Sequence, residues 1–176
     1  NTVSLNNNYK INSNNNIAFG LEKEFEEMRY NEVESIDFKK GEEIASQYVD
    51  FQSKLTNNLY ATMGVRFDQH SQSLNEDSER ISLAYLSDSL GATFKSSYGT
   101  GVKFPSLYEY YKSSKPDSLV AEKGRSFDFG VQKDFIDKGL DIDLTFFNHK
   151  YEDTIEAWKS ASWTPTNLPG VVRTRG

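Results

Sequence analysis

The sequence predicts an all-β protein whose antiparallel strands follow one another up and down, as in the wall of a transmembrane β-barrel. Apolar and polar residues alternate with a period of two over several segments. The clearest of these segments, 59–68 and 140–149, are ten residues long, which suits strands of about 9–11 residues tilted across a bilayer, whereas strands in globular domains average about five or six residues. Short and long connections alternate between them. We expect about eight or nine such strands.

The composition excludes several classes of protein. The chain has 176 residues, a net charge of −6 and no basic cluster, which argues against a nucleic-acid partner. It has no cysteine, and therefore neither a disulfide framework nor a thiolate metal site. No apolar run approaches the ~20 residues of a spanning helix. Aromatic residues reach 14%, more than an ordinary soluble domain needs. A low mean hydropathy does not contradict a barrel, because barrel strands are polar on one face.

The first half of the chain contains the clearest strand. Half of the first sixteen residues are Asn, with none of the features of a signal peptide, so we expect the N-terminus to be cut. Weak alternation predicts strands at 3–10, 17–27 and 44–55. The alternation is strict over Leu59–Asp68, LYATMGVRFD. There we expect lipid contact on one face (Leu59, Ala61, Met63, Val65, Phe67) and a lumen-facing set on the other (Tyr60, Thr62, Arg66, Asp68).

The second half repeats the pattern. Strands are expected at 80–85, 91–98, 126–132 and 140–149, and from 171 onward. A helix is excluded over 140–149, because the carboxylates at 141 and 143 would interrupt any apolar stripe at helical spacing. In the strand at 91–98 we expect Ala92, Phe94 and Tyr98 to face outward and Thr93, Lys95 and Ser97 to face inward.

The connections between these strands have a consistent asymmetry. Short turns are expected at Thr56–Asn58, Ser87–Leu90 and Ile136–Gly139. Long polar connections are expected at Met28–Glu43, Ser71–Ser78 and Thr100–Gly124. In an up-and-down sheet this order places all short turns at one end and all long loops at the other. Outer-membrane barrels have tight periplasmic turns and long external loops, so we expect the long connections to be extracellular.

An ordered series of blocks resembles the barrel of TonB-dependent outer-membrane receptors, over nearly the whole chain from about Ile17. The blocks are GVRFDQHS (64–71), ISLAYLSDSLGATFKSSYGTGVKFPSLYEYY (81–111), KPDSLVAEKGRSFDFGVQ (115–132), DLTFFNHKYEDTIEAW (143–158) and NLPGVVRTRG (167–176). Two positions depart from the pattern: Phe104 stands where the family usually has a small residue, and Ala121 where Pro is common.

The resemblance implies a bacterial outer-membrane barrel of about twenty-two strands, plugged by an N-terminal domain. It further implies import of a scarce small molecule, such as an iron–siderophore chelate or cobalamin, energised through TonB. We therefore expect residues 1–176 to be part of the barrel domain, without the plug and the C-terminal strands. The expected partners are membrane lipid, the plug, the TonB system and the imported ligand. No cofactor is expected.

The stretch YGTGVKFPSLYEYY (98–111) is expected to leave the wall. Gly99 and Gly101 allow unusual backbone angles and close approach, and Pro105 stops strand pairing. A short helical turn could follow at Ser106–Tyr110. The stretch then either folds inward to meet plug or ligand, or shapes the wall and contributes its tyrosines to an outer aromatic girdle. The candidates for facing lumen or plug are Gly99, Gly101, Lys103, Pro105, Tyr108 and Tyr110, together with Arg66 and Asp68, a pair that we interpret as structural.

No catalytic or metal site is predicted. His70 and His149 lack a metal-ligand spacing, and we expect both to be solvated near strand ends. Glu22, Glu24 and Glu26 share one strand face and could hold a cation, but a solvated polar face is favoured. No nucleophile elbow or phosphate loop is present. The alternatives to a receptor are a passive eight-stranded barrel or adhesin and a soluble carbohydrate-binding β-sandwich; an enzyme is the weakest of them.

Overall fold

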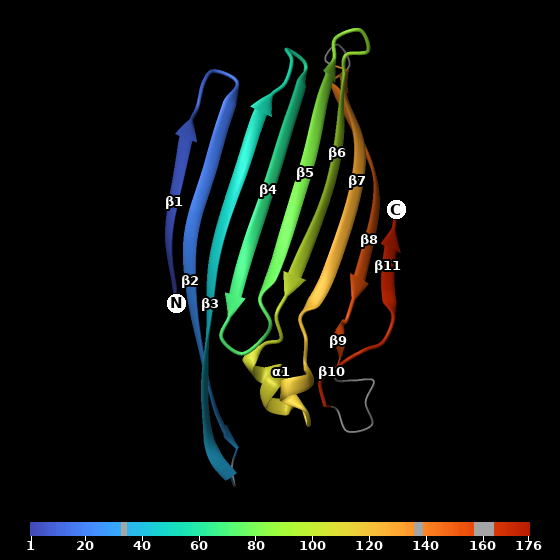
Figure 1. Cartoon of the computed structure of the whole chain (residues 1–176). Coiled ribbons are helices and arrows are strands. Elements are labelled where there is room, and N and C mark those ends of the chain that lie inside the picture. The colour runs from blue at the N-terminus through green and yellow to red at the C-terminus, as the bar shows by residue number, and fades with distance from the viewer. Residues whose placement is uncertain (33–34, 136–138, 157–163) are drawn as a thin grey trace.

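The computed structural model, which describes residues 1–32, 35–135, 139–156 and 164–176, consists mainly of one nine-stranded antiparallel sheet. Its strands follow the order β1-β2-β3-β4-β5-β6-β7-β8-β11, so neighbours in the chain are neighbours in the sheet (Figure 1). The strands are β1 (Thr2–Lys10), β2 (Asn15–Glu32), β3 (Ser35–Lys54), β4 (Leu59–His70), β5 (Glu76–Ser87), β6 (Ala92–Lys103), β7 (Glu122–Phe135), β8 (Leu140–Glu152) and β11 (Val171–Arg175). β9 (Ile155–Glu156) and β10 (Thr166–Asn167) form a separate small pair.

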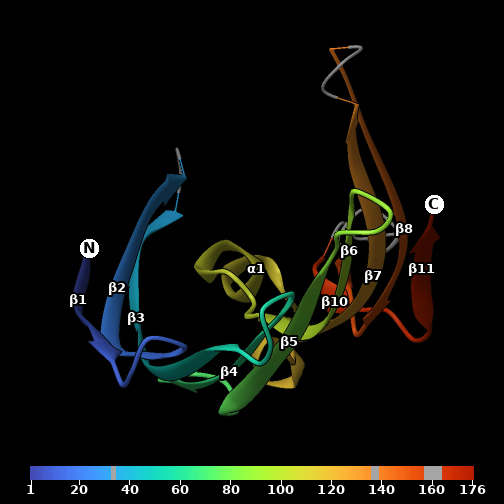
Figure 2. The same cartoon turned by 90° about the horizontal axis from the view of Figure 1, so that it is seen from above.

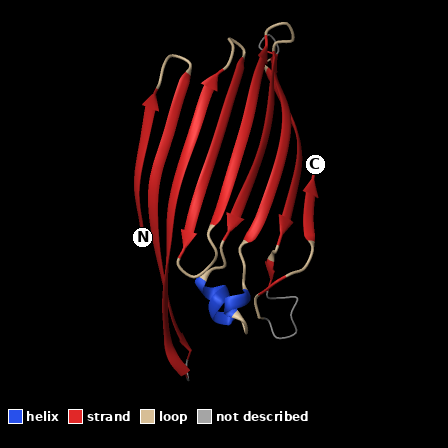
Figure 3. Ribbon diagram, in the orientation of Figure 1, coloured by secondary structure: helices blue, strands red, loops and turns tan. Residues whose placement is uncertain are grey.

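All nine strands expected from the sequence are present, so the all-β, up-and-down prediction is confirmed. The sheet is a single curved layer, and no second sheet packs against its convex side within the described ranges (Figure 2). The sandwich alternative, which needs two facing sheets, is therefore wrong. The short helix α1 (Leu107–Lys112) and the 3₁₀ turn η1 (Pro116–Ser118) lie at one end of the strands (Figure 3). No helix of the described residues is long and apolar enough to cross a membrane.

The two faces of the layer differ in chemistry. On β4, alternate residues Met63, Val65 and Phe67 are 47%, 39% and 50% exposed on the convex face. Their neighbours Arg66 and Asp68 point to the concave side, where they bond side chains of β2 and β3. Since the same alternation continues through the register of most other strands, one face is mainly apolar and the other mainly polar.

The predicted loop at Met28–Glu43 is wrong. β2 and β3, which are 18 and 20 residues long, instead continue there as a two-stranded ribbon that projects beyond the ends of the other strands (Figure 1). Backbone pairing holds the ribbon, and ion pairs cross it from Lys39 to Glu27 at 3.0 Å and from Lys23 to Glu43 at 2.8 Å. Residues 33–34 lie outside the described part of the chain.

The other connections agree with the expected asymmetry. The turns around 56–58 and 87–90 lie at one end of the sheet, and the connection between β4 and β5 and the one that contains α1 lie at the other (Figure 1). Both long connections are shorter than expected, since β5 begins at Glu76 and the segment between β6 and β7 spans 104–121. Of the turn expected at Ile136–Gly139, positions 136–138 are outside the described residues.

Gly99 and Gly101 do not bend the chain as expected. Both stay in the ladder, opposite Ser126 and Gly124 of β7, and the pairing continues to Lys103. The glycines with a positive φ among the described residues are at other positions, 91, 139 and 170. Close approach holds for Gly99, where an added Cβ would lie 3.3 Å from a carbonyl oxygen of β5, whereas Gly101 has open space. The strand ends only where Pro105 removes a donor.

Candidate functional site

The concave face carries a network of ion pairs centred on Arg66. Its Nε donates to Asp68 Oδ1 at 2.9 Å, and its Nη2 donates to Glu22 Oε1 at 2.9 Å and to Ser46 Oγ at 2.8 Å. Ser46 in turn donates to Asp68 Oδ1 at 2.5 Å. The sequence suggested the Arg66–Asp68 pair, but not its extension to β2 and β3. Glu22, considered above as a cation ligand, is instead neutralised by a guanidinium.

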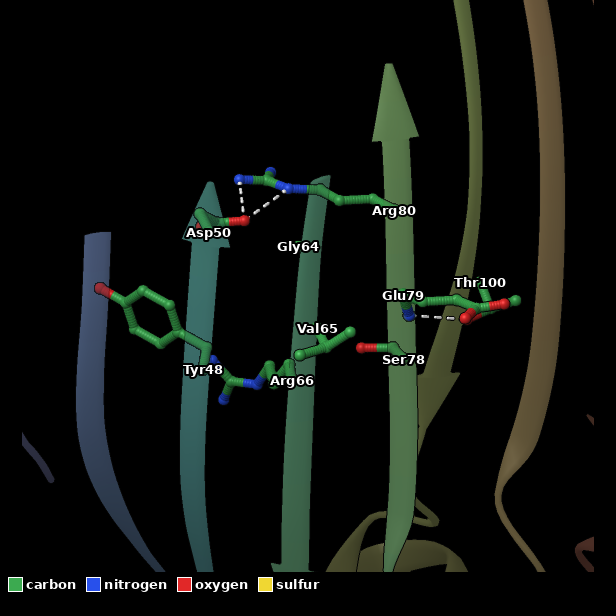
Figure 4. A pocket seen from close by; sticks show the side chains of 9 residues that line it. All are labelled: Tyr48, Asp50, Gly64, Val65, Arg66, Ser78, Glu79, Arg80 and Thr100. Atoms are coloured by element: carbon green, nitrogen blue, oxygen red, sulfur yellow. Dashed lines mark hydrogen bonds and ion pairs between the residues drawn. The ribbon is translucent and has the colours of Figure 1, made fainter. Parts of the chain in front are cut away.

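A second ion pair crosses β4 without involving it. Arg80 of β5 donates to Asp50 Oδ1 of β3 from Nε at 3.1 Å and from Nη2 at 2.9 Å (Figure 4). The residue between them on β4 is Gly64, where an added Cβ would lie 2.0 Å from Asp50 Oδ1. These residues border an open hollow of about 320 Å³ on the concave face. Gly64 therefore serves as a gap through which the side chains of two non-adjacent strands meet.

The same device recurs on β2. Tyr48 of β3 donates its hydroxyl to Asn6 Oδ1 of β1 at 2.9 Å, over the backbone of Gly20. A Cβ on Gly20 would lie 2.6 Å from both that oxygen and Tyr48 Cε1. Bridges of this kind lock alternate strands together on the polar face. The signal in the sequence is a glycine at an inward position of a strand, but it is readable only once the register of the neighbours is known.

His149 is not the solvated residue that the sequence led us to expect. Its Nε2 lies 3.2 Å from Asp128 Oδ1, and about a third of each side chain is exposed. Asp128 also accepts a hydrogen bond from Ser97 Oγ at 3.1 Å. The register places all three residues on adjacent strands of the concave face, which a sequence separation of 21 residues does not reveal. No cluster able to hold a metal ion occurs among the described residues.

The segment 104–121, here called the cover, folds onto the concave side of the wall (Figure 2). Ser106 caps α1 and forms a capping box with Glu109, which matches the helical turn expected at Ser106–Tyr110. Most of the well-buried apolar residues of the described chain belong to the cover: Pro105, Leu107, Tyr110, Leu119 and Ala121; Pro165 lies outside it. The cover is thus a small folded core attached to a wall that has none. Tyr110 is buried within the cover and is therefore not part of an outer aromatic girdle, whereas Tyr108 is exposed.

At its inner end the cover rests on His70 and Glu42, which together with Phe104 and Tyr110 form what we call the rim cluster. The His70 side chain is completely buried, contrary to expectation, because the ring of Phe104 stacks on it with centroids 4.5 Å apart. Tyr110 packs nearby, with Lys40 Nζ 5.3 Å from the centre of its ring. Phe104, the residue that departs from the family pattern, is therefore what closes this site.

The hydrogen bonds of His70 fix its protonation. Its Nδ1 accepts from the backbone N–H groups of Gln72 and Ser73, both at 3.1 Å. A proton on Nδ1 would break both bonds, so the neutral ring carries its proton on Nε2. That nitrogen lies 3.5 Å from Glu42 Oε2, and neither atom has another hydrogen-bond partner. Burial also lowers the pKa of His70, which again favours the neutral ring.

Glu42 is the titrating member of the rim cluster. It lies beyond the last paired residues of β3 and β4, and its side chain is 4% exposed. Burial, followed by the charge of its register partner Glu26, raises the pKa of Glu42 to about 7, although Lys40 opposes the shift. Glu24 adds a further raising effect from β2. The site thus holds a carboxyl group that changes charge near neutral pH.

The identity of the fold follows from comparison with known proteins. A family model described as "TonB dependent receptor-like, beta-barrel" matches residues 1–176, the whole chain. The chain belongs to the TonB-dependent receptor family. Its nine-stranded sheet is a fragment of the larger receptor barrel. No match was found among curated proteins.

Solved structures show the same fold. Over 99% of its length, the present chain is similar to the ferric enterobactin receptor PfeA from Pseudomonas aeruginosa (TM-score 0.80, 17% identity). Over the same share it is similar to the siderophore receptor PirA from Pseudomonas aeruginosa (TM-score 0.81, 23% identity). It is also similar over 93% of its length to the copper transporter OprC (TM-score 0.73, 13% identity). It spans about a third of these proteins, covering 32%, 35% and 31% of them.

The gap at Gly64 can be tested by substitution. We expect Gly64→Ala to displace the Asp50 carboxylate from Arg80 and to lower the free energy of unfolding by on the order of 1 kcal/mol. Gly101→Ala is the matched control, because a Cβ there meets nothing within 4 Å. Urea unfolding of the intact receptor in lipid vesicles measures both variants. Equal stability of the two would show that the close approach at Gly64 does not constrain the wall.

The rim cluster predicts a pH-dependent hold on the cover. A pKa raised from 4.5 to about 7 means that docking of the cover is strongest below pH 4.5 and weakens as pH rises through about 7. Between pH 6 and 8, the equilibrium constant for opening of the cover should rise about tenfold more in wild type than in Glu42→Gln. The lowered pKa of His70 gives docking the opposite pH dependence. This contribution is present in both proteins and therefore cancels when they are compared.

Hydrogen exchange of the α1 amides, corrected for intrinsic rates, measures this opening in the intact receptor. Glu43→Gln is the control, since Glu43 is the next residue but is 53% exposed and pairs with Lys23 on the other face. It should retain the pH dependence of wild type. If Glu42→Gln and Glu43→Gln have the same pH profile as wild type, Glu42 does not control the cover.

Proposed function

We propose that this chain is part of an outer-membrane receptor that imports a scarce small-molecule ligand by TonB-coupled active transport. The observation that carries the proposal is the family match over the whole chain. Members of such a family act as receptors and transporters, so we infer transport in preference to catalysis. In this proposal residues 1–176 belong to the barrel domain, and the plug and further strands belong to other parts of the protein.

The two faces of the sheet support a position in the membrane. Large apolar side chains are exposed along the convex face of most strands, including Leu21, Met63, Leu83, Phe129 and Leu144. A soluble protein rarely leaves so broad an apolar surface uncovered, whereas a barrel covers it with lipid. The concave face, with its ion pairs, then faces the lumen and the plug. The alternation of short and long connections supports an extracellular position for the long connections and the cover.

The printed names of the neighbours support the proposal of a metal-containing ligand. PfeA is described as a ferric enterobactin receptor, one PfeA variant has been solved in complex with enterobactin, and OprC is described as a copper transporter. For the present chain we infer an iron–siderophore chelate, cobalamin or a similar compound. The cover offers Tyr108, which is 52% exposed, as a residue able to contact ligand or plug.

The remaining candidates of this region have supporting roles in the proposal. Lys103 is held by Glu122 at 2.6 Å and Glu109 at 3.7 Å, so it fixes the cover to the end of β6 and β7. Pro105 and Tyr110 are buried within the cover. Gly99 and Gly101 leave the concave face of β6 without side chains at these two positions, beneath the cover. Arg66 and Asp68 line the lumen as a structural pair.

The facing of β4 gives a stability test of the membrane position. Met63→Arg should cost ~2–4 kcal/mol near the bilayer midplane, because it places a charge against lipid. Thr62→Arg, one residue away on the concave face, should cost much less. Folding of the intact receptor into vesicles, followed by denaturant titration, gives both values. Equal costs would contradict the assignment of the two faces.

Transport itself is tested in cells that express the intact receptor as their one route for the compound. We expect uptake of either ferric enterobactin labelled with radioactive iron or radiolabelled cobalamin, abolished by an uncoupler of the inner-membrane proton gradient. Uptake that persists with the uncoupler would indicate a passive barrel. No receptor-dependent uptake or binding of either probe would contradict the proposed ligand class.

A further inference from the structure

A patch of basic side chains occupies the convex face where β7, β8 and β11 reach the end that carries the cover. In the register of these strands, Arg125 lies opposite Lys150, and Lys150 lies opposite Arg173. Arg175 lies one row further along β11, opposite Asn148. The Lys123 side chain, one row nearer the cover, instead reaches Glu76, the register partner of the concave residue Asp68, at 2.7 Å. We call the other four residues the basic patch: Arg125, Lys150, Arg173 and Arg175.

The alternation of β7 and β8 assigns the patch to the convex face. Asp128 and His149 bond each other on the concave side, so Arg125 and Lys150, each an odd number of positions away, point to the opposite side. Arg125 and Lys150 also share a partner on that side, Glu152, at 3.8 Å and 2.5 Å. The basic patch therefore faces away from the lumen.

The patch has more positive charge than the protein neutralises. Residues directly opposite on neighbouring strands have Cβ atoms about 4.5–5.5 Å apart, and like charges at that distance are destabilising. The carboxylate that pairs with the patch is Glu152, which Arg125 and Lys150 share. Arg173 and Arg175 form no ion pair within the described ranges and are exposed. Four cations thus face one carboxylate, which leaves a surplus of three positive charges.

The patch also has a defined position along the strands, relative to the apolar band of the convex face. Directly below it on the convex face come Phe127 and Phe129 of β7 and Phe146 and Leu144 of β8, all at least 42% exposed. The basic side chains therefore stand at the border between the apolar band and the cover end. On β5 the same height carries Asp77 and Glu79, so the positive charge is confined to β7, β8 and β11.

We propose that the basic patch binds the phosphate groups of a phosphorylated lipid headgroup in the outer leaflet. The inference rests on the proposed position of the sheet in the membrane, which places the apolar band in hydrocarbon and the patch at headgroup level. Arginine side chains match phosphate oxygens with paired hydrogen bonds, and the acyl chains of the same lipid cover the aromatic residues below. A lipid is favoured over free phosphate because the charged and apolar contacts are contiguous.

The test uses the intact receptor in nanodiscs of neutral phosphatidylcholine, with and without lipid A, a glycolipid that carries two phosphates. Native mass spectrometry of the released receptor measures retained lipid A. The variant is Arg173→Gln with Arg175→Gln, because removing these side chains leaves no carboxylate unpaired. The control is Lys23→Gln with Lys133→Gln, which removes two convex-face cations outside the patch.

We expect the variant to lose affinity for lipid A by at least about tenfold, since each cation near the headgroups contributes on the order of a factor of five. The control should retain wild-type binding, and Arg173→Lys with Arg175→Lys should retain most of it. Equal retention by variant and wild type would overturn the inference, as would full displacement of lipid A by millimolar inorganic phosphate. A receptor that inserts into neither kind of nanodisc would instead contradict the membrane position.

Discussion

The ladder of backbone hydrogen bonds that runs from β1 to β11 is the interaction on which the rest of the structure depends. A single layer has no interior, and its strands contribute no well-buried large apolar side chain within the described chain. The wall is therefore held by backbone pairing and by cross-strand contacts, and each of its faces must suit a different environment. This constraint explains why polar and apolar residues alternate so regularly, because every residue of a strand faces one environment or the other.

The concave ion pairs add connections that the ladder cannot supply. Backbone pairing joins each strand only to its immediate neighbours, whereas Asp50–Arg80 joins β3 to β5 and Glu22–Arg66 joins β2 to β4. Such bridges require a small residue or a short side chain on the intervening strand, which Gly64 and Ser46 provide. The polar face thus resists slippage of one strand along the next, since a shift of one residue would break these pairs.

The cover shows how a wall without a core can carry a folded element. Its own apolar residues form a small core, its capping box stabilises α1, and Lys103 fixes it to β6 and β7. The contact with β3 and β4 then depends on Phe104 and on one buried carboxyl group, Glu42. A contact with so few members can open without disturbing the ladder. The basic patch, on the other face, is independent of it.

The sequence by itself determined the strands, their two faces and the end at which the cover lies, because these follow from local alternation and connection length. It also indicated the Arg66–Asp68 pair, whose members are two residues apart on one face. It did not show that β2 and β3 continue as a ribbon beyond the other strands. Only the tertiary structure decided the burial of His70, the Asp50–Arg80 bridge over Gly64 and the alignment of Arg125, Lys150 and Arg173. Each of these joins residues separated by tens of positions, and the register that brings them together is a property of the whole sheet.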